Sequence, residues 1–269
     1  MASTRQTLDV AVRRQAISHV IFDFDGTLSW LRHGWPDVML ELFCEFVSDD
    51  LRQSSLFRQE LRHDILSLNG KPSIHQVLSF RERARTVAAK TPDPDVLLNL
   101  YLQRLASTVA KRTEAVKTAA EAASSFVIAG TYELLARLQS RRLTLIILSG
   151  TAERDVRDEA ALLDLSRFFG PHIYGSAPGI SFSKKEIIER LLHEERIDGS
   201  HLLAFGDGPV EIEFSKAVGG LAIGVASDEH VNGSGRIDPD KQEHLLQAGA
   251  DAIIPDYQNA EELMARLFP

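Results

Sequence analysis

The sequence lacks the features that define several classes of protein. Its 269 residues include a single cysteine, Cys44, so no disulfide framework or cysteine-rich zinc site can form within the chain. Because Cys44 lies among apolar residues, we expect a buried structural thiol. No apolar run approaches the ~18 residues that a membrane-spanning helix needs. The nine histidines are scattered without a closely spaced pair, so their default roles are on the surface or in the core.

Positive charge is also scarce. Lysine and arginine number 30 against 38 acidic residues, a formal net charge of -8, and no polybasic cluster or aromatic stacking motif appears. Nucleic acid is therefore not expected as a partner. The first twenty residues carry arginines but no apolar signal-peptide core or cleavage signature, so we expect a cytoplasmic protein without a membrane partner. The length suits one core domain and a smaller second one.

The segment 19–28 is the most informative stretch. Its apolar strand pattern ends in Asp23 and Asp25, and Gly26 follows. In an open α/β sheet ligands bind beyond the carboxyl ends of the strands, so both carboxylates would face a crevice. A divalent cation would relieve their repulsion and leave one oxygen free to attack an electrophile. The alternative is an ordinary aspartate-rich turn.

Three later segments have complementary chemistry. A second apolar run ends in Ser149 and Gly150, where a hydroxyl and turn N–H groups can hold an anion. Lys184 opens an amphipathic helix, and since a first-turn lysine opposes the helix dipole, an external negative partner is expected. A third strand delivers Asp207, and Glu211 follows four residues later. Together these segments supply a nucleophile, metal ligands, anion donors and a cation.

The four segments, in this order, resemble the motifs of the haloacid dehalogenase-like hydrolase superfamily. The resemblance is to its phosphatase branch with a helical cap, similar to phosphoglycolate phosphatase and β-phosphoglucomutase. It implies an α/β fold, a doubly wound parallel sheet (Rossmann-like core) with an inserted all-helical cap domain, and Mg²⁺ as cofactor. The spacing of the third motif favours Lys184 over Lys185. The fourth motif departs from the family, whose second acid is usually aspartate; whether Glu211 binds metal directly or through water stays open.

The resemblance also implies a role for each motif residue. Asp23 would be the nucleophile that forms an aspartyl-phosphate. Asp25, two residues on in an extended chain and so on the same side, would be the general acid and base. The other implied roles are phosphate binding by Ser149, Gly150 and Lys184, and metal binding by Asp23, the backbone carbonyl of Asp25, Asp207 and Glu211. Two plainer alternatives are a helix N-cap at Ser149 and a dipole-stabilised first-turn acid at Glu211.

Strand and helix patterns alternate in most of the chain, which is typical of a doubly wound sheet. Strands are expected at about 19–25, 143–149, 172–175, 202–206, 221–225 and 251–255. Between Ser29 and Ser125 the apolar spacing is helical instead, in stretches at 37–47, 56–68, 74–89, 95–111 and 112–123. We therefore expect a catalytic core of residues 1–28 and 126–269 and a helical cap of residues 29–125.

Candidates for substrate contacts lie in the cap and its hinge. The segment 68–77 resembles the family's cap loop that reaches the core, so Lys71 is one candidate. Arg32 and Trp35 follow the first motif, and Arg32 could bind a second anionic group of the substrate. Alternatively, all three residues only pack or solvate the cap. A long polar loop at 226–240, expected to follow an edge strand, receives no role.

The favoured function is a Mg²⁺-dependent phosphatase that hydrolyses a small phosphorylated metabolite, with phosphoglycolate or a sugar phosphate as the expected class. The enzyme alternative is a β-phosphoglucomutase-like phosphotransferase. A catalytically silent binding protein on the same fold is disfavoured because the motif residues are intact. No motif indicates the oligomeric state.

Overall fold

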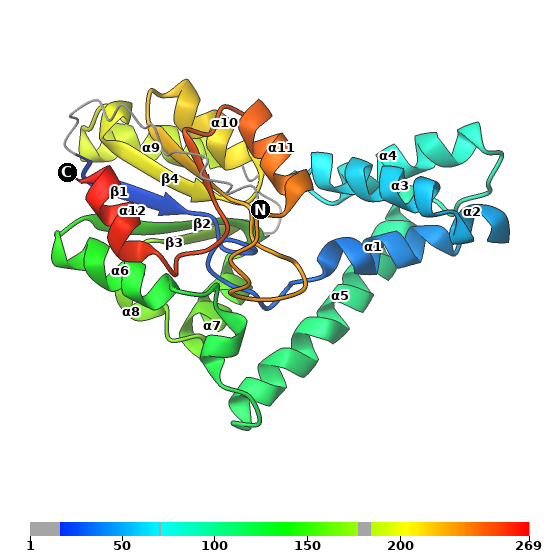
Figure 1. Ribbon diagram of the computed structural model, residues 1–269, viewed down its shortest axis with the longest axis horizontal. Helices are drawn as coiled ribbons and strands as arrows, with labels where there is room; N and C mark the ends of the chain where they lie inside the picture. The colour runs from blue at the N-terminus through cyan, green and yellow to red at the C-terminus, as the bar shows by residue number, and fades with distance from the viewer. Residues whose placement is uncertain (1–16, 70, 177–183, 269) are drawn as a thin grey trace, which may run out of the picture.

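A six-stranded parallel sheet forms the centre of the computed structural model, which describes residues 17–69, 71–176 and 184–268 (Figure 1). The strand order is β3-β2-β1-β4-β5-β6. The strands are β1 (His19–Phe22), β2 (Thr144–Ala152), β3 (Ile173–Ser176), β4 (Leu202–Gly206), β5 (Leu221–Val225) and β6 (Ala252–Ile254). The predicted doubly wound sheet is thus confirmed. Residues 1–16, on which the expectation about a leader partly rests, lie outside the described residues.

Helices cover both faces of the sheet (Figure 1). They are α6 (Thr131–Ser140), α7 (Glu153–Leu162), α8 (Ser166–Phe169), α9 (Lys184–Glu195), α10 (Pro209–Ala217), α11 (Pro239–Gln247) and α12 (Ala260–Leu267), with short 3-10 helices at Ala123–Phe126 and Gly199–His201. Because side chains alternate along a strand, β1 contributes side chains to the apolar clusters on both faces of the sheet. Val20 and Phe22 pack in the cluster that contains the leucines of α6, whereas Ile21 packs with Ile188 of α9.

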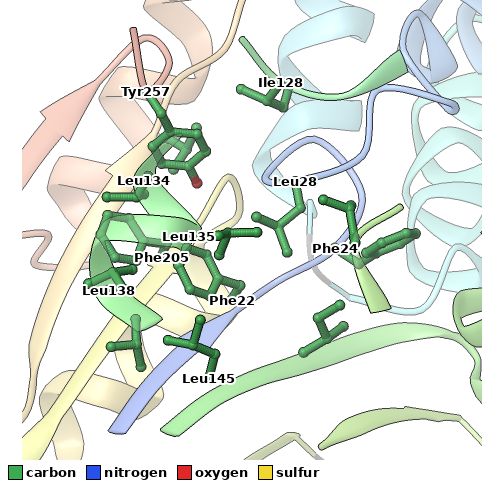
Figure 2. Packing of buried hydrophobic residues seen from close by; sticks show 14 of the residues in the cluster. Phe22, Phe24, Leu28, Ile128, Leu134, Leu135, Leu138, Leu145, Phe205 and Tyr257 are labelled. Atoms are coloured by element: carbon green, nitrogen blue, oxygen red, sulfur yellow. The ribbon is translucent and has the colours of Figure 1, made fainter. Parts of the chain in front are cut away.

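Aromatic packing fixes the end of β1 that carries the first motif. Phe22 stacks on Phe205 of β4 with ring centroids 4.9 Å apart, and Tyr257 meets Phe205 edge-on at 5.8 Å. Figure 2 shows these rings beside Leu134 and Leu138. Each such buried side chain contributes about 1.5–3 kcal/mol relative to an exposed one. The residue after Phe22 is therefore held on a rigid strand end.

The segment between β1 and β2 is helical and has its own apolar core. Its helices are α1 (Trp35–Cys44), α2 (Asp49–Gln53), α3 (Ser55–Ser67), α4 (Ile74–Thr86) and α5 (Pro94–Lys117). Residues such as Met39, Leu61 and Phe80 form a cluster separate from the clusters of the sheet. Cys44 is buried in this helical cluster, as expected. Figure 1 shows the helices extending to one side of the sheet.

Two expectations about this segment are wrong in detail. The expected division between the stretches 95–111 and 112–123 is absent, because no breaker separates Lys111 from Arg112; one helix, α5, runs through this point and ends at Lys117, short of residue 123. The sequence pattern also does not predict the short helix α2. The prediction of helices without a strand holds, and α1, α3 and α4 lie within a few residues of their expected positions.

The chain enters and leaves the helical segment through two linkers that run side by side. Ser29 and Val127 form an antiparallel bridge, and the amide of Trp30 donates to the carbonyl of Phe126 at 2.7 Å. Arg112 of α5 donates to the carbonyl of Leu31 at 2.6 Å. The linkers therefore form one paired hinge beside the end of β1.

The strand boundaries correct three further expectations. β1 ends at Phe22, before Asp23, whereas β2 continues to Ala152. The polar loop after Val225 does not follow an edge strand, since β6 pairs with the outer side of β5.

Among the described residues, no helix is both long and apolar enough to cross a membrane.

Candidate active site

Asp23 lies directly after β1, at the carboxyl edge of the sheet. Its amide donates to the carbonyl of Phe205 at 2.9 Å, and its carboxylate accepts a hydrogen bond from Lys184 Nζ at 2.7 Å. The residue is only 8% exposed. Burial raises the pKa of Asp23 to about 7, against the opposing charge of Lys184. A buried carboxylate at a strand end, held by one ammonium group, is placed for chemistry at this edge.

Lys184 is the first residue of α9, and its side chain points into the protein. Its Nζ also donates to Oε1 of Glu211, in the first turn of α10. Burial alone would lower the pKa of Lys184, but Asp23 and Glu211 raise it above its ordinary value. Lys185, by contrast, lies on the exposed side of the helix, 3.7 Å from Glu189. The negative partners expected for a first-turn lysine are thus carboxylates of the protein itself.

Asp25 lies in the turn after β1, in different surroundings. One carboxylate oxygen accepts a hydrogen bond from the hydroxyl of Thr151 at 2.8 Å, and the other accepts from Arg32 at 2.8 Å. Arg32 also pairs with Glu159 of α7, at 2.5 and 2.8 Å. Because β1 ends at Phe22, Asp25 does not lie on an extended strand, contrary to the expectation from the sequence. Side chains from β2 and the hinge orient Asp25 instead.

Ser149 and Gly150 lie on β2, next to β1 in the sheet. Ser149 is buried, and its Oγ accepts a hydrogen bond from the amide of Thr151 at 3.1 Å. Gly150 is exposed. The N-cap of the following helix α7 is Ala152, so Ser149 does not have the plain capping role considered from the sequence.

Asp207 follows β4 and packs directly against Gly26. Gly26 has a φ of +77°, and a Cβ there would lie 2.2 Å from Asp207 Oδ2. Only glycine allows both this backbone conformation and this approach. Burial raises the pKa of Asp207 to about 6, against the opposing charge of Lys241, whose Nζ is 3.2 Å from Oδ2.

The helical segment reaches this site through the loop after α3. Asn69 Nδ2 donates to the backbone carbonyl of Asp207 at 3.1 Å. Asn69 therefore brings the loop to the core, as predicted. Lys71 is exposed. Gly70, the glycine of the loop, lies outside the described residues. Trp35 packs against the apolar core of the helical segment. The structure does not bring Lys71 or Trp35 into contact with the carboxylates.

A family model of haloacid dehalogenase-like hydrolases matches residues 17–219. The chain belongs to this family. The match spans all four motifs, from Asp23 to Glu211. No curated protein matches the chain.

Solved structures show the same fold at low sequence identity. A conserved haloacid dehalogenase-like protein of unknown function from Agrobacterium tumefaciens is 16% identical with a TM-score of 0.64, covering 94% of this chain and 100% of its own. A predicted phosphoglycolate phosphatase from Haemophilus somnus is 14% identical with a TM-score of 0.59, covering 93% and 99%. A β-phosphoglucomutase from Clostridium difficile is 11% identical with a TM-score of 0.57, covering 93% and 97%.

The donor chemistry of this haloacid dehalogenase-like hydrolase suits a hard divalent cation. Within the described residues, no group of three or more His, Cys, Asp or Glu side chains is already arranged around one metal position. Asp23 and Asp207 nevertheless follow neighbouring strands, and the charge of Asp23 raises the pKa of Asp207. Glu211 Oε2 is buried and has no hydrogen-bond partner among the described residues. Unpaired carboxylate oxygen at such an edge fits Mg²⁺ and its bound water.

Several residues of this hydrolase site were missed from the sequence. Glu159, Glu229 and Lys241 are all less than 10% exposed, and each makes an ion pair near the motif carboxylates. The sequence contains one indication of Lys241. Lys241 lies four residues before Leu245, and both are on the buried face of α11. A charged residue on an apolar helix face requires a buried partner. The partner itself could not be identified from local sequence.

Proposed function

We propose that the chain is a Mg²⁺-dependent phosphatase that hydrolyses a small phosphorylated metabolite through an aspartyl-phosphate on Asp23. The observation that carries this proposal is the buried Asp23–Lys184 pair, with Asp25 two residues on in a separate set of contacts. Phosphoryl transfer needs an aligned nucleophile and neutralised oxygens, and little other chemistry from the protein. In this proposal Asp23 supplies the nucleophile, and Lys184 supplies positive charge beside it.

The residues divide the reaction between them. Asp23 attacks phosphorus while Asp25 protonates the leaving oxygen; Asp25 then takes a proton from the water that hydrolyses the aspartyl-phosphate. Lys184, Ser149 and the backbone at Gly150 bind the phosphoryl oxygens. Mg²⁺, held by Asp23, the carbonyl of Asp25, Asp207 and Glu211 directly or through water, would neutralise charge on those oxygens.

Residues 29–125 act in this proposal as a cap that selects the substrate. A helical cap over the site suits a small molecule, because closure excludes water from the reacting groups. The names of two structural neighbours, a phosphoglycolate phosphatase and a β-phosphoglucomutase, agree with phosphoglycolate or a sugar phosphate as substrate class. We propose a cytoplasmic enzyme without nucleic-acid or membrane partners.

The test is a screen of purified protein against phosphoglycolate, sugar phosphates, nucleotides and p-nitrophenyl phosphate. Released phosphate is measured with Mg²⁺ and with EDTA, and Asp23→Asn is the control for contaminating phosphatases. We expect Mg²⁺-dependent release from a small monophosphate. Transfer of the phosphoryl group to a sugar hydroxyl that depends on a sugar bisphosphate, without matching release of phosphate, would indicate the phosphotransferase instead. A flat response with every compound would contradict enzymatic function.

A further inference from the structure

A second buried lysine lies beside the motif carboxylates. Lys241 of α11 is 2% exposed, and its Nζ is 3.2 Å from Oδ2 of Asp207. The same Nζ contacts Glu229 Oε1 at 2.5 Å and donates to Ser227 Oγ at 3.1 Å. A buried ammonium group is costly unless it is paired and hydrogen-bonded. Three oxygen partners around one Nζ fix its position closely.

The polar loop after β5 supplies two of those partners and connects them to the hinge. Glu229 is 3% exposed, and its second oxygen accepts a hydrogen bond from the amide of Gly34, the residue that precedes α1. The hydroxyl of Ser227 donates to the carbonyl of Gly26 at 3.0 Å. Lys241 is thus connected through Ser227 to the turn of the first motif, and through Glu229 to the start of the helical segment.

The charges of this cluster suit one divalent cation. The four carboxylates of Asp23, Asp207, Glu211 and Glu229 face the two ammonium groups of Lys184 and Lys241. When all four carboxylates are ionised, these six groups carry two unmatched negative charges, which a single Mg²⁺ would neutralise. Lys184 pairs with the nucleophile side of the cluster, and Lys241 pairs with the Asp207 side.

We propose that Lys241, anchored by Glu229, is a positioning residue that holds the carboxylate of Asp207 in the orientation that binds Mg²⁺. This inference rests on the proposed function. The loop at 226–238 thereby acquires a role, because it brings Glu229 and Ser227 to Lys241. Residues that hydrogen-bond a metal ligand set its orientation, and their loss typically costs about 10- to 100-fold in metal affinity.

The experiment is a direct measurement of Mg²⁺ binding by isothermal titration calorimetry on the full chain. Lys241→Met alone would leave Glu229 buried without its ammonium partner, a cost large enough to threaten folding. The double variant Lys241→Met with Glu229→Gln avoids this problem and keeps the net charge of the cluster. We expect it to bind Mg²⁺ about 10- to 100-fold more weakly than the wild type. The concentration of Mg²⁺ needed for half-maximal activity should rise in parallel, with little change in substrate KM at saturating Mg²⁺.

Two further variants keep the inference falsifiable. Glu229→Gln alone preserves the side-chain shape and should weaken Mg²⁺ binding in the same direction, by a smaller factor. Lys216→Met breaks a different, partly exposed lysine–aspartate pair, in which Nζ lies 2.6 Å from Oδ1 of Asp251. This variant should leave Mg²⁺ affinity unchanged. A folded double variant with unchanged or tighter Mg²⁺ binding would overturn the positioning role. A wild-type protein that binds no Mg²⁺ would instead contradict the proposed function, and this inference with it.

Discussion

The two aspartates of the first motif differ in their surroundings more than in their spacing. Asp23 is buried against Lys184, whereas the side chain of Asp25 is 22% exposed and accepts hydrogen bonds from Thr151 and Arg32. Carboxylates whose environments differ in this way can take different chemical roles. The more exposed aspartate can exchange protons with a leaving group and with water, and the buried one can attack phosphorus.

Asp25→Asn should therefore slow the reaction without unfolding the protein. The amide cannot transfer a proton, and we expect turnover to fall about 10²- to 10⁴-fold, the range for a lost general acid or base. Steady-state release of p-nitrophenol measures this directly. Unchanged turnover and an unchanged pH–rate profile would assign the acid and base role to another residue.

Gly26→Ala tests the close approach of the first and fourth motifs. A methyl group there would overlap the Asp207 carboxylate, in addition to the strain of a positive φ. We expect Mg²⁺ binding and turnover to be lost together, because Asp207 must move. Calorimetric titration with Mg²⁺ and release of p-nitrophenol measure the two losses.

Gly219→Ala is the matched control for this substitution. Gly219 also has a positive φ, of +87°, but no atom lies within 4 Å of the position that a methyl group would take. The free energy of unfolding should fall by only roughly 1–2 kcal/mol, the cost of an alanine in the left-handed conformation. The activity should be unchanged. Equal losses of activity in the two variants would show that backbone strain alone explains the effect.

The helices and strands that depend on a local pattern of apolar and polar residues could be predicted from the sequence. The apolar runs of β1, β2 and β4 end in polar residues, so the placement of Asp23, Ser149 and Asp207 at one edge followed from the parallel sheet. Pairings across the chain could not be predicted in this way. Arg32 meets Glu159, 127 positions away, and the same guanidinium group also pairs with Asp25.

Arg32→Ala should accordingly affect the chemistry with every substrate. Arg32 holds Asp25, and a lost hydrogen bond to a charged group costs about 1.5–3 kcal/mol. We expect kcat/KM to fall about tenfold or more even with p-nitrophenyl phosphate, a change of at least ~1.4 kcal/mol.

Lys71→Ala removes an exposed cation of the cap and serves as the comparison. It should change KM only for substrates large enough to reach the cap, and leave p-nitrophenyl phosphate unaffected. If Arg32→Ala instead changed KM for one substrate class alone, Arg32 would be a substrate contact, as first considered from the sequence.

For the molecule as a whole, the buried carboxylates link stability to pH and to Mg²⁺. Asp23 and Asp207 have pKa values of about 7 and about 6 in the folded protein, above the ordinary value of 3.8. As pH rises from 4 to 7 the unfolded chain loses these protons first, so the folded state binds more protons than the unfolded state. The contribution of these groups to the free energy of unfolding therefore falls with rising pH.

A cation that binds the ionised carboxylates should reverse this loss. We expect Mg²⁺ to raise the midpoint of thermal unfolding much more at pH 7.5 than at pH 5, and its binding near pH 6.5 to release protons. Thermal melts at the two pH values measure the first effect, and titration calorimetry in buffers of different ionisation enthalpy measures the second. The Asp207→Asn variant should lose most of the Mg²⁺ effect. An equal effect of Mg²⁺ at both pH values would contradict this linkage.

In the proposed reaction Asp23 carries the phosphoryl group, and chemical trapping of that group identifies the residue that bears it. Asp25→Asn protein, in which hydrolysis is slowed, is mixed with p-nitrophenyl phosphate and Mg²⁺ and then treated with sodium borohydride, which reduces an acyl phosphate to the alcohol. Peptide mass spectrometry should find homoserine in place of Asp23, and none without substrate. Reduction at a different residue, or an unmodified Asp23 in protein that releases p-nitrophenol, would contradict the role of Asp23 as nucleophile.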